Sequence, residues 1–147
     1  MKILLAIDDS EFSEAVIQAL IAQAPPKGSE VRVLHVIEPL PAVYGGSEWG
    51  YVMDWQAVTR EQRKQAEAFM ARAAQTLRAA GFQITTAIEE GAPKAVILDT
   101  AAKWPADLIM LGSHGRRALD RFLLGSVSEA VARHSTCSVQ IVRAAKR

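Results

Sequence analysis

The chain has 147 residues, half of them hydrophobic and 22% charged, which fits one globular domain with a sizeable core. The formal net charge of +1 offers no basic surface of the kind that binds nucleic acid, so no nucleic-acid partner is expected. The single cysteine, Cys137, excludes an internal disulfide, and the first apolar run is too short for a membrane span, so we expect a cytoplasmic protein with no membrane partner.

Short apolar runs alternate with segments of helical periodicity along the whole chain. The runs are rich in aliphatic and β-branched residues and predict strands, whereas apolar residues spaced three or four apart predict helices. The predicted strands cover residues 3–7, 31–37, 82–88, 108–111 and 139–142, and the predicted helices cover 11–24, 54–80, 93–103 and 126–134. Asp9 or Ser10 can cap the first helix, and the prolines and glycines of 39–50 predict a loop.

This alternation predicts a single α/β domain with a parallel sheet and helices on both of its faces. The third strand is the most polar, which favours a position at an edge of the sheet. In such sheets ligands bind at the carboxyl ends of the strands, near the point where the strand order reverses. Three of these ends carry candidate residues: Asp8 to Ser10, Val36 to Glu38, and the segment that begins at Gly112.

The segment 112–128 combines glycines with the start of the last helix. Gly112 and Gly115 bracket a tight turn, in which backbone amides can approach a phosphate without a Cβ atom in the way. Gly125 and Ser126 stand at the beginning of the helix, whose free amides and positive dipole end attract phosphate oxygens. These residues together predict an anion site.

Each piece of this segment also has a use that needs no ligand. Ser126 followed by Glu129 makes a capping-box pattern, and the glycines alone could serve a turn. The hydroxyls of Ser126 and Ser128 could instead donate to a phosphate. The spacing matches neither a Walker A loop nor a dinucleotide fingerprint, so these residues alone indicate an anion but no particular nucleotide.

Gly112, Gly115, Gly125 and Ser126 resemble the ATP-binding signature of universal stress proteins, with two glycines three apart, a third ten residues later and a serine next to it. The likeness extends to residues 3–10, 35–36, 111–116 and 139–142. It implies a three-layer α/β sandwich with sheet order 3-2-1-4-5. It also implies that residues 1–147 form one nucleotide-binding domain of this type, usually a homodimer. Because all four signature residues are present, the chain resembles the branch that binds ATP, with or without Mg²⁺.

The resemblance also implies a set of nucleotide-binding residues. They are Ala6, Asp8, Val36, Leu111, Gly112, His114, Gly115, Gly125, Ser126 and Val127. By position, Asp8 would contact the ribose hydroxyls, and the Val36 backbone would meet the adenine edge with Leu111 beside the base. The segment 112–115 would hold the ribose and phosphates, and 125–127 would hold the phosphates at the helix start.

The leading hypothesis is therefore an ATP-binding regulatory protein of the stress-response type, without catalytic residues and without a metal site in the protein. His35, His114 and His134 show no metal-ligand spacing. One alternative is a slow ATPase that uses Asp8 and a divalent ion. Another is a nucleotide-free structural dimer joined through Val139 to Val142, because an exposed apolar edge strand needs a cover.

Overall fold

The computed structural model describes residues 1–40, 54–115 and 123–144, so the predicted loop at 39–50 lies outside the described residues from position 41 onward. Strands and helices alternate along these ranges. In chain order they are β1 (Lys2–Ala6), α1 (Glu11–Gln23), β2 (Glu30–Ile37), α2 (Trp55–Ala79), β3 (Gln83–Glu90), α3 (Pro93–Lys103), β4 (Leu108–Gly112), α4 (Ser126–His134) and β5 (Ser138–Val142). Every predicted element is present, and the predicted ends agree with the observed ends within two residues.

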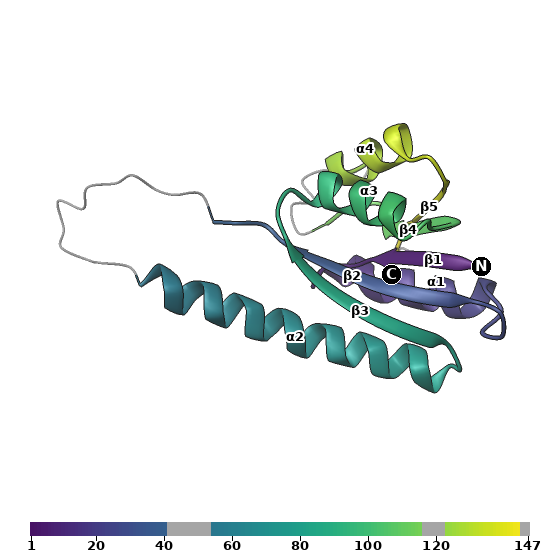
Figure 1. The fold of residues 1–147 in the computed structure, drawn as a ribbon, viewed down its shortest axis with the longest axis horizontal. Helices are drawn as coiled ribbons and strands as arrows, with labels where there is room; N and C mark the ends of the chain where they lie inside the picture. The colour runs from purple at the N-terminus through teal and green to yellow at the C-terminus, as the bar shows by residue number, and fades with distance from the viewer. Residues whose placement is uncertain (41–53, 116–122, 145–147) are drawn as a thin grey trace.

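The five strands form one sheet in the order β3-β2-β1-β4-β5, and every neighbouring pair is parallel. Helices α1 and α2 pack on one face, whereas α3 and α4 pack on the other (Figure 1). The predicted order and the three-layer arrangement are confirmed. Strand β3, the polar one, lies at an edge as expected, and β5 forms the opposite edge.

The apolar sequence of β1 follows from its position in the middle of this sandwich. Ile3 and Leu5 pack against α1 and α2, whereas Leu4 and Ala6 pack against α3 and α4. A strand covered on both faces needs apolar side chains on both of them, and residues Ile3 to Ala6 provide these. Full burial of a large aliphatic side chain stabilises the fold by about 1.5–3 kcal/mol, so β1 anchors the carboxyl end from which Asp8 emerges.

Candidate functional site

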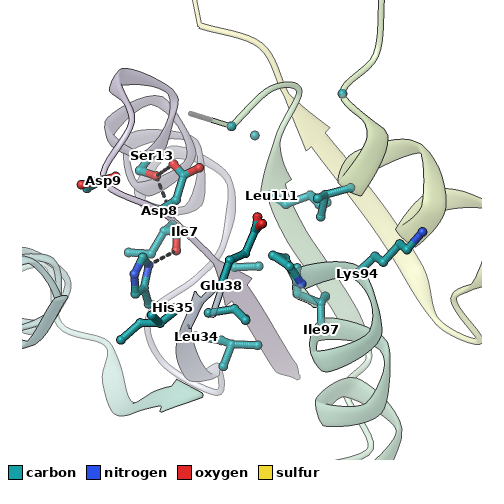
Figure 2. A pocket seen from close by; sticks show the side chains of 18 of the residues that line it. Ile7, Asp8, Asp9, Ser13, Leu34, His35, Glu38, Lys94, Ile97 and Leu111 are labelled. Atoms are coloured by element: carbon teal, nitrogen blue, oxygen red, sulfur yellow. Dashed lines mark hydrogen bonds between the residues drawn. The ribbon is translucent and has the colours of Figure 1, made fainter. Parts of the chain in front are cut away.

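A cavity of about 530 Å³ opens at the carboxyl ends of β1, β2 and β4. The first turns of α3 and α4 and one side of α2 complete its walls (Figure 2). All the nucleotide-site residues predicted from the sequence line this cavity: Ala6, Asp8, Val36, Leu111, Gly112, His114, Gly115, Gly125, Ser126 and Val127. The fold therefore gathers residues from four separate segments of the chain at one place.

One wall of the cavity is apolar. It is formed on the α3 and α4 face of the sheet by Leu34 and Val36 of β2, Leu111 of β4 and Ile97 of α3. Figure 2 shows Leu111 and Ile97 on this side of the cavity, away from His35 and Ser13. An apolar wall of this kind suits a flat, weakly polar group such as a nucleobase.

The Asp8 carboxylate is held in place by the turn that begins α1. Its Oδ1 accepts hydrogen bonds from the Ser10 backbone amide at 3.0 Å, from the Ser10 hydroxyl and from the Ser13 hydroxyl at 3.2 Å. The Ser13 hydroxyl in turn accepts from the Asp8 amide at 2.9 Å (Figure 2). Ser10 is the N-cap residue of α1, one of the two predicted, but its side chain makes no capping hydrogen bond because it binds Asp8.

The second Asp8 oxygen, Oδ2, faces the glycine turn after β4. A Cβ atom at Gly115 would lie only 2.8 Å from this oxygen. An unrestrained aspartate could move aside, but Ser10 and Ser13 hold this one. Glycine at position 115 therefore lets the turn and the carboxylate approach each other, and it leaves Oδ2 open to a ligand hydroxyl.

The first turn of α4 is arranged differently from the capping box that the sequence allowed. Gly125 is the N-cap residue and makes no side-chain capping bond, so Ser126 is the first residue inside the helix. The Gly125 amide donates to the Ser113 carbonyl at 2.8 Å, and a Cβ atom at Gly125 would lie 3.0 Å from that oxygen. The next amides of the turn have no partner within the helix, as at any helix start. They provide the anion-binding end that was predicted.

Ser128 does not have the role that the sequence suggested. It was expected to offer a hydroxyl to a phosphate, but this hydroxyl is buried and donates to the Gly112 carbonyl at 2.6 Å. The prediction was wrong because Ser128 is the third residue of α4 and faces β4. Its hydroxyl joins the helix to the strand.

His114 brings an unsatisfied polar atom to the site. Its Nδ1 lies 3.1 Å from the Ser113 hydroxyl, and its ring packs at a tilt on Phe12, with 5.5 Å between ring centres. In the described part of the chain, His114 Nε2 and Ser29 Oγ are the two buried side-chain polar atoms without a hydrogen-bond partner. A buried nitrogen in this state is better satisfied when a ligand or water supplies a partner.

Some residues at the cavity were not predicted as site residues. His35, expected at the end of a strand, lies buried inside β2, with Nδ1 3.0 Å from the Ile7 carbonyl. Lys94 and Ile97 of α3 and Phe69 of α2 also line the cavity. The start of α3 at Pro93 was predicted, and this could have placed Lys94 at the same edge of the sheet.

Within residues 1–40, 54–115 and 123–144, no three His, Cys, Asp or Glu side chains gather so that they could hold a metal ion. The helices described in these ranges include none that is long and apolar enough to cross a membrane. The recognisable chemistry of the site is thus an apolar wall, a fixed carboxylate and the start of a helix.

These features define a parallel α/β domain with a cavity where the strand order reverses, between β1 and β4, which is where such folds bind ligands. The chain matches the model of the universal stress protein family over residues 1–143. It therefore belongs to the universal stress protein family, as the resemblance indicated.

Known proteins agree with this assignment over nearly the full length. The universal stress protein Sll1388 of Synechocystis sp. is 32% identical, over 97% of both chains. The solved structure of the hypothetical protein MJ0577 has a TM-score of 0.84 and 29% identity, covering 99% of this chain and 97% of that one. A universal stress protein solved in complex with cAMP has a TM-score of 0.69 and 24% identity, covering 97% of this chain and 96% of that one.

Proposed function

We propose that this universal stress protein binds an adenine nucleotide, ATP in particular, and acts as a nucleotide-dependent regulatory factor in a stress response. One observation carries the proposal. A single cavity joins an apolar wall at Val36 and Leu111, a fixed carboxylate at Asp8 and the open first turn of α4. A nucleotide has a base, a sugar with hydroxyl groups and phosphates, which require these three environments.

The roles of the residues follow from this chemistry. The base would lie against the apolar wall, and a ribose hydroxyl would donate to Asp8 Oδ2. The phosphates would lie at the amides of Ser126 and Val127, where the helix dipole favours negative charge. Mg²⁺, when present, would be held chiefly by the phosphates, since this ion commonly keeps several waters and few protein ligands. The family member solved with cAMP supports an adenine ligand.

The proposal includes a homodimer formed through β5. This strand pairs with β4 along one edge, and the four residues Val139 to Val142 are half-buried in the single chain. A second copy of the chain would cover the side of β5 that faces away from β4, together with the apolar residues of this strand. Light scattering at micromolar concentration is expected to give the mass of two chains, and a monomer would contradict the dimer. The cytoplasm is the proposed location, in keeping with the single unpaired Cys137.

The proposed activity is binding rather than hydrolysis. Asp8, the candidate for a divalent-ion-dependent ATPase, already has Oδ1 engaged by Ser10 and Ser13. That oxygen is held as part of a positioning turn, and among the described residues Asp8 belongs to no group of three His, Cys, Asp or Glu side chains that could hold a metal ion. Sustained phosphate release that disappears in Asp8→Ala would favour the ATPase instead.

The test is ATP binding to protein freed of nucleotide, measured by calorimetry and by native mass spectrometry. We expect wild-type protein to bind ATP and Gly125→Val to lose most of its affinity, because the added side chain meets the Ser113 carbonyl. Ala132→Val, at an exposed position of α4, is the matched control and should bind like wild type. Circular dichroism checks that both variants are folded. Undiminished binding by folded Gly125→Val would contradict the proposal.

A further inference from the structure

The ladder between β1 and β2 changes just before Asp8. Ala6 pairs with Leu34, and the Ile7 amide donates to the Leu34 carbonyl at 3.0 Å. In a parallel ladder the next bond would run from the Val36 amide to the Ile7 carbonyl. The described backbone bonds do not include it. The Ile7 carbonyl instead lies 3.0 Å from Nδ1 of His35.

The His35 ring is fixed for this contact. It is 5% exposed, and the Phe69 ring meets it edge-on with 5.8 Å between the ring centres. A carbonyl oxygen can only accept, so Nδ1 carries the proton and donates. Figure 2 shows this bond beneath Asp8, on the other side of the cavity from Leu111. The imidazole thus takes the place of the Val36 amide without entering the apolar wall.

We propose that His35 is a positioning residue that keeps the Val36 amide available to the base of the bound nucleotide; this inference rests on the proposed function. The N–H and C=O groups of one strand residue point to the same side, so Val36 presents a donor and an acceptor beyond the end of β1. Adenine offers a ring-nitrogen acceptor beside an amino donor and is complementary to this pair. His35 therefore preserves this pairing group for the base without touching the base itself.

The first test uses the ligand-free protein and amide hydrogen exchange followed by NMR. In wild type the Val36 amide should exchange faster than the amides of Leu34 and Ile7. His35→Leu replaces the imidazole with an apolar side chain of similar bulk and removes the donor, so the Ile7 carbonyl becomes free for Val36 and exchange at Val36 should slow. His35→Asn retains a side-chain N–H donor and should behave like wild type. A Val36 amide as protected as Leu34 in wild type, or unchanged in His35→Leu, would overturn the inference.

The second test compares ATP with its 1-deaza and 7-deaza analogues, in which one ring nitrogen is replaced by CH. Wild type should bind one analogue roughly three- to tenfold more weakly than ATP, the usual worth of one hydrogen bond. His35→Leu should lose this discrimination, and His35→Asn should keep it. Equal affinity of wild type for all three ligands, or discrimination retained in His35→Leu, would overturn the inference alone. Failure of wild type to bind ATP would overturn the proposed function, and this inference with it.

Discussion

Two groups of side chains at opposite ends of the sheet differ in whether their polar atoms are paired within the protein. At the amino ends of the strands the Lys2 amide donates to the Asp107 carboxylate at 2.6 Å. The side chains of Lys2 and Arg32 lie over the Trp104 ring, 5.4 and 4.6 Å from its centre. At the carboxyl ends, Asp8 Oδ2 faces the Gly115 turn and His114 Nε2 is buried without a partner among the described residues.

This difference separates a part of the fold expected to carry stability from the proposed binding site. Lys2, Arg32, Trp104 and Asp107 at the amino ends contact one another, so the loss of these contacts should affect folding. Asp8 and His114 at the carboxyl ends line the cavity of the proposed nucleotide site, so their removal should affect binding. Parallel strands place all their carboxyl ends at one edge, which is why the two properties can separate so cleanly.

The largest effect should come from Trp104→Ala at the amino end. Trp104 is 8% exposed, and the cationic groups of Lys2 and Arg32 lie over its ring. Its loss should therefore lower the free energy of unfolding by about 3–5 kcal/mol. ATP affinity of the folded variant should not change. Denaturant unfolding and calorimetry measure the two quantities. Trp55→Ala is the control, because Trp55 is 42% exposed and its loss should cost less than about 1 kcal/mol. Equal losses in the two variants would contradict this view of the amino end.

At the carboxyl end, Gly115→Val should weaken ATP binding roughly 10- to 100-fold, the range expected when a side chain is forced into an occupied space. The added group would meet Asp8 Oδ2. Stability should change little, because position 115 is exposed. Calorimetry and thermal unfolding test both statements. If Gly115→Val lowers the stability but binds ATP normally when folded, the carboxyl end would contribute to stability rather than to binding, which would contradict the expectation.

A smaller effect is expected from Ser13→Ala, which removes two of the bonds that hold Asp8. Ser10 would still bind the carboxylate, so ATP affinity should fall only about three- to tenfold. The preference for ATP over 2′-deoxy-ATP should shrink as well, since Asp8 is expected to contact the ribose. Ser138→Ala on the exposed start of β5 is the control. If Ser13→Ala keeps the wild-type preference for ATP over 2′-deoxy-ATP, the hydrogen bonds from Ser13 are not needed to position Asp8.

The smallest effect is expected at Lys103, the last residue of α3, which precedes Trp104 in the chain. Its ammonium group donates to Asp99 at 2.8 Å, and this hydrogen bond and the charge of Asp99 raise the pKa of Lys103. A raised folded-state pKa contributes stability below the unfolded value that is lost as the pH rises through the folded value. Asp99→Asn should therefore lower the Lys103 pKa in an NMR titration, without a measurable change in ATP binding. An unchanged pKa would contradict the pairing.

The fold was predictable because strand burial leaves a strong pattern in the sequence. The polar run of β3 indicated an edge strand, and the resemblance implied the strand order with β1 in the middle; both are confirmed. The resemblance supplied the site residues, and the structure brings them around one cavity. Their contacts with a nucleotide remain a prediction.

The details that could not be predicted depend on contacts between distant segments. No local pattern shows that His35 would bind the carbonyl of Ile7, 28 residues earlier, or that Ser128 would bind Gly112. The capping box predicted at Ser126 is absent for a related reason. Gly125 is the N-cap residue of α4, and its amide donates to the carbonyl of Ser113, which lies in a distant segment. Sequence spacing gives the elements, but side-chain partners depend on how the elements pack.

The most direct measurement is an ATP titration monitored by backbone amide NMR, because the amide signals report on both ends of the sheet in one experiment. The account predicts large shift changes at the amides of Val36, Gly115 and Val127, and none at Lys2 and Asp107. Saturable changes centred on Lys2 and Asp107, with the other three amides unmoved, would contradict the assignment of the nucleotide to the carboxyl ends.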